Sequence, residues 1–257
     1  MQVWHMSGAG NDFMVLDARG KTLDYPTLAK KLCAMTKADG FMAVDTSEKA
    51  DFRMHFYNSD GSRGEMCGNG SRCICRFAYE NGIAGEQVRV ETDAGIVKGE
   101  RRSKDTYRVW LNVPGVLDLE RKPDCAYVEL GNPGIPHVVK EVPDLTWDMS
   151  EKLRPEAVSL RYDPAFPKGA NVNFYRWIGE HTVRVLTYER GVENYTLACG
   201  TGCGSVTCVL WALGELPGKH LITEVRGGKL EYHIKGSDHV KELIMDGPTE
   251  ILKIYEV

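Results

Sequence analysis

The chain has 257 residues, with 32 lysines and arginines against 36 aspartates and glutamates, so its formal net charge is −4. This balance gives no field that would gather nucleic-acid phosphates or an anionic membrane surface. Hydrophobic residues make up 42%, and no apolar run approaches the ~20 residues of a membrane span. The amino-terminal residues also lack the basic and apolar regions of a secretion signal. We therefore expect a cytoplasmic protein that binds a small molecule, with neither nucleic acid nor membrane as a partner.

Helical and strand patterns alternate along the chain. Short alternating or β-branched runs bounded by Gly, Asn and Pro predict strands, and apolar residues at helical spacing predict helices. In chain order the patterns predict a helix at 26–36, a strand at 54–59, a helix at 70–81, strands at 88–92 and 108–113, a helix at 149–159, a strand at 183–189, a helix at 203–214 and a strand at 243–247. The runs at 70–81 and 203–214 are apolar on nearly all sides, which indicates buried helices.

The segments 55–80 and 185–212 share one order of features. Each has a β-rich stretch, a polar turn, and then Cys-Gly-x-Gly at the start of an apolar-periodic run. The two cysteines are Cys67 and Cys199, 132 residues apart. Similarity between two segments of one chain suggests a duplicated unit.

Two further pairs of segments follow the same order. ETDAGIVKGE at 91–100 resembles TEVRGGKLEY at 223–232, and GAGNDF at 8–13 resembles GANVNF at 169–174, which pairs Asn11 with Asn171. We therefore expect an α+β fold of two pseudo-symmetric domains, 1–114 and 115–246. Each would be a curved, mixed or antiparallel, barrel-like sheet around a central helix, with the active site in the cleft between the domains.

Both Cys-Gly-x-Gly motifs place a thiol where a helix begins. Unpaired N–H groups and the positive end of the helix dipole stabilise a thiolate there, and can lower a cysteine pKa from about 8.5 to roughly 3.5–7.5. The glycines leave room for a carboxylate to reach the same N–H groups. Two such thiols facing one carbon can invert a stereocentre, because one removes the α-proton and the other delivers a proton to the opposite face.

Four segments carry a family resemblance. GAGNDF at 8–13, FYNSDGSRGEMCGNGSRC at 56–73, NVNF at 171–174 and YERGVENYTLACGTG at 188–202 resemble diaminopimelate epimerase, a pyridoxal-phosphate-independent enzyme. The resemblance implies interconversion of LL- and meso-diaminopimelate, with Cys67 and Cys199 as the acid/base pair and no cofactor. It also implies a homodimer, and a last strand at 247–257 that returns to the first domain.

The resemblance assigns further roles residue by residue. Gly68, Asn69, Gly200 and Thr201 would hold the reacting α-carboxylate and amine, with Asn11 beside them. Asn58, Asn171 and Arg190 would recognise the distal amino-acid end. Glu189 would add a backbone contact and, with His137, tune the pKa values of the thiols. Tyr255 falls where the family has a dimer-contact tyrosine.

The segment GNPGIPH at 131–137 departs from the Gly-Asn-Pro-His that is usual in the family. Either Asn132 keeps the distal contact and three residues are inserted before His137, or His137 keeps register and Ile135 replaces the asparagine. This departure leaves a second hypothesis open, in which the same two thiols racemise another amino acid such as histidine.

A third hypothesis, from a different class, is a thiol-rich metal-binding or redox protein. The six cysteines outside the motif positions lack the flanking residues of Cys67 and Cys199, so we interpret them as core residues: Cys33, Cys73, Cys75, Cys125, Cys203 and Cys208. The two clusters, Cys67-x5-Cys73-x-Cys75 and Cys199-x3-Cys203-x4-Cys208, do not have the paired short intervals of structural zinc sites. We therefore expect no metal ion.

Overall fold

The computed structural model describes residues 1–64 and 66–256. The chain divides into two compact units, Met1–Trp110 with Asp246–Val257, and Leu111–Met245. None of the helices among the described residues is both long and apolar enough to cross a membrane.

The first unit holds two helices and the strands on both sides of them. Its elements are β1 (Gln2–Gly8), β2 (Asn11–Asp17), α1 (Tyr25–Thr36), β3 (Gly40–Asp45), β4 (Phe52–Asn58), β5 (Arg63–Gly64), α2 (Gly68–Glu80), β6 (Gln87–Thr92), β7 (Gly95–Arg101), β8 (Thr106–Leu111) and β18 (Glu250–Glu256). The strands pair in the order β18, β1, β2, β3, β4, β6, β7, β8, and β5 pairs with β4. The pairs β2–β3 and β4–β6 are parallel, and the others are antiparallel.

The second unit repeats this plan. Its elements are β9 (Pro114–Lys122), β10 (Cys125–Gly131), β11 (Gly134–Glu141), η1 (Trp147–Met149), α3 (Ser150–Arg161), β12 (Asn171–Gly179), β13 (Thr182–Glu189), β14 (Asn194–Tyr195), α4 (Gly200–Ala212), η2 (Pro217–Lys219), β15 (His220–Val225) and β16 (Gly228–Lys235). The strand β17 (Glu242–Pro248) begins in this unit and ends in the first. The order is β9, β10, β11, β12, β13, β15, β16, with β11–β12 and β13–β15 parallel.

The run β1, β2, β3, β4, β6, β7 in the first unit matches the run β10, β11, β12, β13, β15, β16 in the second, with the parallel pairs at the same places, and this match corrects one sequence alignment. The pairing of Asn11 with Asn171 is wrong, because Asn11 begins β2 whereas Asn171 begins β12, the counterpart of β3. The counterpart of Asn171 is Gly40, and the counterpart of the turn before Asn11 is the Gly131–Gly134 turn. The segment GANVNF at 169–174 and the Gly131–Gly134 turn both contain Gly and Asn. Similarity over a few residues therefore matched Asn11 to the wrong segment.

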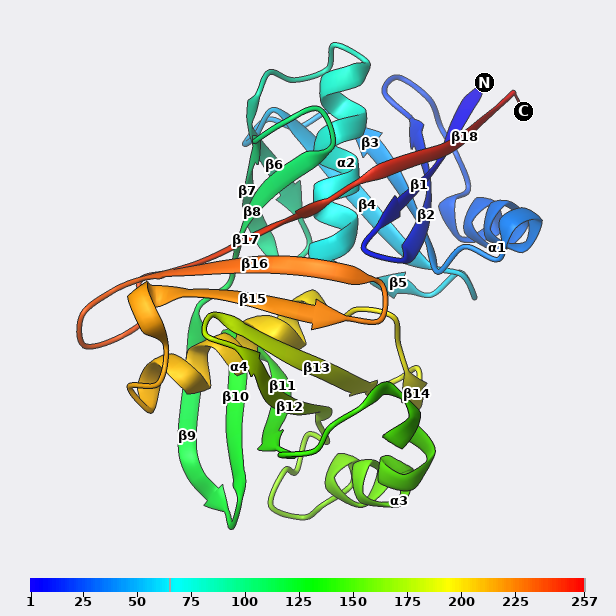
Figure 1. Cartoon of the computed structure of the whole chain (residues 1–257). Helices are drawn as coiled ribbons and strands as arrows, with labels where there is room; N and C mark the ends of the chain where they lie inside the picture. The colour runs from blue at the N-terminus through cyan, green and yellow to red at the C-terminus, as the bar shows by residue number, and fades with distance from the viewer. Residues whose placement is uncertain (65, 257) are drawn as a thin grey trace. The chain divides into compact units, whose positions relative to one another are not determined.

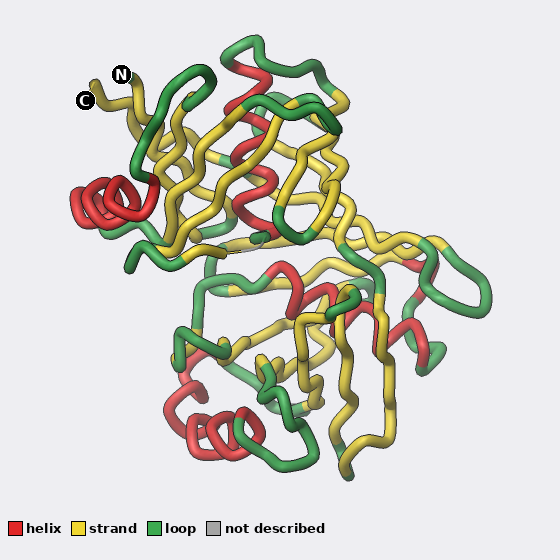
Figure 2. The backbone as a smooth tube through the Cα atoms, turned by 180° about the vertical axis from the view of Figure 1, so that it is seen from behind, coloured by secondary structure: helices red, strands yellow, loops and turns green. Residues whose placement is uncertain are grey.

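The long helices α2 and α4 form the middle of their units. Figures 1 and 2 show α2 running between the strands of the first unit, where it contacts β1, β2, β3 and β7. The Trp4 and Phe77 rings pack edge to face, with their centroids 5.2 Å apart, and this contact packs α2 against β1. The helix α4 contacts β9, β10, β11, β12 and β16 in the same way.

The buried helices are confirmed, with two differences. Arg72 and Arg76 are both buried in α2, so this helix is not apolar on all sides. Arg76 donates to the carbonyl oxygen of Thr249 at 2.6 Å, a bond that ties α2 to the residue before β18. The helix α4 begins at Gly200 rather than 203, because its glycine-rich first turn has low intrinsic helix propensity and gives no apolar signal.

The strands curve around these helices, and the α+β class is confirmed. All the strands belong to one 18-stranded sheet, and among the strand pairings of the described residues none closes it into a barrel.

Candidate active site

Cys67 and Cys199 have the same local structure at the starts of α2 and α4. Each is the residue before its helix, with an extended backbone (φ −134°, ψ 122° for Cys67 and φ −119°, ψ 104° for Cys199). The Cys67 Sγ accepts from the Gly70 N–H at 3.5 Å, and the Cys199 Sγ from the Gly202 N–H at 3.3 Å. Both thiols are thus N-caps, and they lie at helix N-termini, where the positive end of the helix dipole favours a ligand such as a carboxylate.

The second glycine of each motif lies in a crowded place. A β-carbon on Gly202 would overlap the Asn173 Oδ1 and approach the Cys199 Sγ at 3.2 Å. One on Gly70 would lie 2.9 Å from the Met42 Sδ. Glycine is therefore used here for close packing against the capping sulfur.

The charge environment of Cys199 differs from the sequence expectation. Burial raises the pKa of this thiol well above its usual value, and the nearby Glu189 carboxylate raises it further. Hydrogen bonds from Thr201, whose Oγ1 lies 3.6 Å from the Sγ, and from the Gly202 N–H act in the opposite direction but are weaker. The expected lowering by the helix terminus is therefore wrong for Cys199, because desolvation outweighs it.

Polar side chains link the start of α2 to β2. The Asn69 Nδ2 donates to the Asn11 Oδ1 at 2.5 Å, and the Asn11 Nδ2 donates to the Asp39 Oδ2 at 3.3 Å. Asp39 also accepts from the Asp12 N–H at 2.9 Å. A β-carbon on Gly8 would lie 2.8 Å from the Asn69 carbonyl oxygen, so the β1–β2 turn lies directly against the helix start. Gly68, the first residue of α2, is buried there as well.

A second group surrounds the ends of β12 and β13. The Asn171 Oδ1 accepts from the Arg190 N–H at 2.9 Å, while its Nδ2 donates to the Pro136 carbonyl oxygen at 3.1 Å. The Arg190 side chain is exposed and donates from Nη1 to the Lys168 carbonyl oxygen at 3.0 Å. Glu189 accepts from the Thr196 hydroxyl at 2.6 Å. The structure thus brings Asn171, Glu189 and Arg190 together, and Glu189 also acts electrostatically on Cys199.

His137 is completely buried on β11, opposite Asn171 in the parallel register. Burial lowers its pKa to about 3, and the Arg190 charge lowers it further, so the ring is neutral. Its Nδ1 lies 3.3 Å from the Asn173 Nδ2, and its Nε2 has no hydrogen-bond partner among the described residues. Because Asn173 packs on Gly202, His137 reaches the start of α4 through that amide.

The remaining residues lie elsewhere in their units. Asn58, at the end of β4, is exposed and donates to the Ser62 Oγ at 2.9 Å. Asn132 is exposed in the turn between β10 and β11, whereas Ile135 is half-buried on β11. Tyr255 is half-buried on β18, opposite Val3 of β1.

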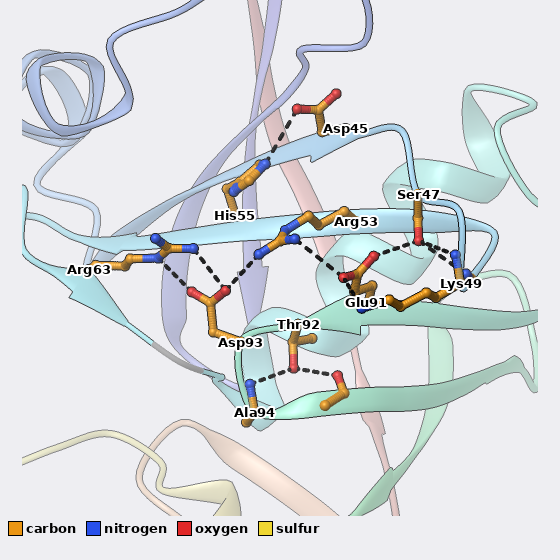
Figure 3. Close-up of polar contacts among 12 residues, drawn as sticks. Asp45, Ser47, Lys49, Arg53, His55, Arg63, Glu91, Thr92, Asp93 and Ala94 are labelled. Carbon is orange, nitrogen blue, oxygen red and sulfur yellow. Dashed lines mark hydrogen bonds and ion pairs between the residues drawn. The ribbon is translucent and has the colours of Figure 1, made fainter.

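An ionic network holds the strand that leads to Cys67. Figure 3 shows Arg63 of β5 and Arg53 of β4 converging on Asp93, which follows β6. Arg63 makes a two-pronged contact at 2.5 and 2.8 Å, and Arg53 donates at 3.0 Å. Burial acts to raise the pKa of Asp93, but the two guanidinium groups outweigh it and lower the pKa overall. The chain entering the Cys67 motif is thus fixed four residues before the thiol.

The sequence analysis missed two buried residues beside α4. Asn173 donates to the Val138 carbonyl oxygen at 2.9 Å and accepts from the Thr187 hydroxyl at 3.0 Å. Tyr232 of β16 donates to the Gly200 carbonyl oxygen at 2.7 Å. The alternation of NVNF, which places Asn171 and Asn173 on one face of a buried strand, could have indicated the first. No local pattern indicates the second.

The comparisons with known proteins identify the family. The chain matches the diaminopimelate epimerase family over residues 3–111 and 130–252. It is 37% identical over 275 residues to the diaminopimelate epimerase of Aquifex aeolicus, covering 100% of this chain and 96% of that protein. The fold is similar to that of a Bacillus anthracis phenazine biosynthesis protein of the PhzF family, with a TM-score of 0.78, 16% identity and coverage of 100% and 98%. It is also similar to a hydroxyproline epimerase from Agrobacterium vitis, with a TM-score of 0.73, 18% identity and coverage of 100% and 90%.

A duplicated α+β fold in which a cysteine caps each central helix, together with these relatives, defines an isomerase of the epimerase type. The chain belongs to the diaminopimelate epimerase family.

Proposed function

We propose that the protein interconverts LL- and meso-diaminopimelate, a step of lysine and peptidoglycan-precursor synthesis, by proton transfer between Cys67 and Cys199 without a cofactor. The single observation that carries the proposal is the matched N-cap geometry of these thiols on the central helices of two duplicated units. The family and the relatives' names favour diaminopimelate over histidine as the substrate.

The proposed reaction moves one proton onto a thiolate and another off a thiol. Cys199 enters as the thiol, because burial raises its pKa. The Cys67 thiolate then takes the α-proton, and the C–H electron pair is held as a planar carbanion conjugated to the carboxylate. Cys199 gives its proton to the opposite face, which inverts the centre. The reverse reaction exchanges the two roles.

The helix termini stabilise the charge that develops on the α-carboxylate. Gly68 and Asn69 begin α2, and Gly200 and Thr201 begin α4, so their N–H groups can hold the carboxylate as it gains enolate character. Asn11 is hydrogen-bonded to Asn69 and Asp39, which fix the orientation of its amide. The Asn11 Oδ1 would accept a hydrogen bond from the substrate ammonium. His137 is neutral and supports α4 through Asn173.

Recognition of the distal end rests on Arg190, Asn171 and Asn58. The exposed Arg190 guanidinium donates from Nη1 to the Lys168 carbonyl oxygen. Its other N–H groups can donate to a substrate carboxylate. Asn171 fixes the backbone of Arg190. Arg190→Met should therefore lower kcat/KM for diaminopimelate at least tenfold, since a charge-assisted hydrogen bond is worth roughly 1.5–3 kcal/mol. A slow reaction with a short amino acid should lose much less.

The deciding experiment is incubation in D₂O with LL-diaminopimelate and a panel of L-amino acids that includes histidine, followed by NMR of the α-proton. We expect deuterium incorporation and epimerisation with diaminopimelate alone. Cys67→Ser and Cys199→Ser should each abolish epimerisation while remaining folded, because an alcohol cannot supply the base at neutral pH. Near-normal turnover by either variant would refute the two-thiol mechanism, and a preference for histidine would refute the substrate.

We also propose that the protein is a cytoplasmic homodimer that pairs through β18. Tyr255 lies on this strand, and the neighbouring Leu252 and Ile254 are 42% and 45% exposed. Exposed apolar residues on an edge strand favour association. Ile254→Asp should give a monomer in analytical ultracentrifugation, and Leu213→Asp in the second unit is a matched control. An unchanged sedimentation coefficient for Ile254→Asp would exclude this surface.

A further inference from the structure

Three metal-ligating side chains gather on the β15–β16 hairpin of the second unit, which Figure 1 shows as two neighbouring orange strands. His220 and His233 are directly paired across the two strands, and Glu231 lies two residues before His233. Paired residues and residues two apart project from the same face of a sheet, so all three side chains share one face. The intervening Leu221 and Tyr232 are buried on the opposite face.

The ligand atoms of the three side chains lie within 4.8 Å of one another. His220 Nε2 is 2.7 Å, and His233 Nε2 is 3.3 Å, from the Glu231 Oε1. Ligand atoms around a tetrahedral zinc ion with bonds near 2.0–2.1 Å are about 3.3–3.4 Å apart. The His233–Glu231 separation already equals this spacing, and the His220–Glu231 separation is shorter.

The His220 ring supplies a second, independent observation. Its Nε2 is buried and has no hydrogen-bond partner among the described residues, although the Glu231 oxygen is 2.7 Å away. The N–H direction therefore does not point at that oxygen. A buried ring nitrogen without a hydrogen-bond partner, lying beside a carboxylate, is an arrangement that a bound metal ion would satisfy.

We propose that His220, Glu231 and His233 form a binding site for a divalent transition metal of the zinc class, separate from the epimerase chemistry. Imidazole nitrogens favour Zn²⁺, Ni²⁺ or Cu²⁺, whereas Mg²⁺ and Ca²⁺ prefer oxygen ligands. Two histidines with one carboxylate leave at least one coordination position to water. All three ligands are only partly buried, so an ion can enter from solvent.

The competing explanation is a pair of protonated histidines that share the Glu231 carboxylate. The His220 and His233 rings are stacked, with centroids 4.9 Å apart and planes inclined by 21°. Two imidazolium charges at that separation repel each other. A single divalent cation can bind both rings in their neutral state, which avoids this repulsion. This comparison favours a bound metal ion over two protonated histidines.

The site would join two strands that also support α4. Tyr232, between Glu231 and His233, donates from the opposite face to the Gly200 carbonyl oxygen. Metal bound across β15 and β16 would add a crosslink to this hairpin and stabilise the second unit. At 100 times its dissociation constant, the metal should raise Tm by about 5 °C or more.

Zinc titration of metal-free protein, followed by isothermal calorimetry and by NMR of the histidine rings, tests the proposal. We expect the His220 and His233 resonances to shift together up to one equivalent, and those of His239 to remain unchanged. MgCl₂ should produce no shift. The ring signals also distinguish this site from zinc bound by the eight free cysteines.

Two variants make the test specific. His220→Phe keeps the ring stack but removes the ligand nitrogen, and Glu231→Gln removes the carboxylate charge. Loss of a residue that only hydrogen-bonds to a metal ligand already costs about 10–100-fold in metal affinity, so loss of a ligand itself should cost each variant at least about 100-fold. His239→Ala, which removes an exposed histidine paired with Asp238, is the matched control and should bind as the wild type does. Equal affinity in wild type and His220→Phe, or ring signals that respond to pH alone, would overturn the proposal.

Discussion

The Cys199 thiol shows how burial and helix polarity oppose each other at one residue. The Gly202 N–H and the α4 dipole favour a thiolate, but the sulfur lies in a residue that is only 8% exposed. Loss of hydration dominates, and the Glu189 carboxylate adds repulsion. A protonated Cys199 is the form required of a proton donor, so this environment fits one direction of the proposed reaction.

Glu189→Gln should make Cys199 more reactive. Removal of the negative charge lowers the thiol pKa, and each unit of that fall raises the thiolate fraction tenfold at a pH below it. We expect roughly three- to tenfold faster alkylation of Cys199 by iodoacetamide at pH 8, measured by peptide mass spectrometry. Glu180→Gln, an exposed site in the same unit, should leave the rate unchanged. A slower reaction in Glu189→Gln would show that the carboxylate activates the thiol instead.

His137 should make the protein sensitive to mild acid. Its pKa is about 3 in the folded protein, whereas an unfolded histidine titrates near 6.5, so the unfolded state binds the extra proton between these values. The stability due to the neutral ring is present above pH 6.5 and is lost as the pH falls toward 3, by up to about 1.4 kcal/mol per pH unit.

His137→Gln should show a shallower loss over the same range, measured by urea unfolding at pH 7, 6 and 5. Other titrating groups, including His55, are present in both proteins and cancel in the comparison. Parallel stability curves for the two proteins would mean that His137 is not the buried neutral group described above.

At the scale of elements, the two helix starts are alike in backbone and unlike in packing. Gly202 meets the rigid amide of Asn173, which is fixed by bonds to Val138 and Thr187. Gly70 meets the flexible end of Met42. The second unit therefore tolerates less change at its Cys-Gly-x-Gly motif than the first.

Gly202→Ala should displace the start of α4 and with it Cys199. Overpacking of this kind costs typically 1–3 kcal/mol, and we expect kcat for epimerisation to fall at least tenfold. Gly70→Ala should have a smaller effect, because the Met42 side chain can move. Gly179→Ala is the control, since a β-carbon there makes only ordinary contact at 3.6 Å. The measurements are kcat in an epimerase assay and Tm in thermal unfolding. Equal losses of kcat and Tm for Gly70→Ala and Gly202→Ala would contradict the difference in packing.

At the scale of the whole molecule, the duplication was visible in the sequence because Cys67 and Cys199 stand at equal places before equal patterns. The helices were predictable for the same reason, since each apolar run is long. The pairing of Asn11 with Asn171 failed because a short Gly-Asn turn recurs in non-equivalent positions, and only the sheet register identifies the true counterpart.

Contacts that depend on pairing between strands could not be predicted. His220 and His233 meet only because the turn between β15 and β16 sets their register, and nothing in either strand alone specifies it. The buried Arg72 is a similar case, because charge in a sequence favours a surface position whereas this side chain is fully buried. Local patterns specify elements, and the arrangement of those elements specifies the polar groups they enclose.

The proposed mechanism makes one demand on the whole chain, which is that two thiols from separate units reach the same carbon. Thiols that close should form a Cys67–Cys199 disulfide when the substrate-free protein is treated with diamide, which is reduced as the two thiols are oxidised. Epimerase activity should disappear and return with dithiothreitol, and non-reducing peptide mapping should recover the linked pair. Saturating diaminopimelate should protect, because the substrate separates the sulfurs. If the oxidised, inactive protein kept both cysteines free, the two thiols would not lie close together, and the two-thiol mechanism would be wrong.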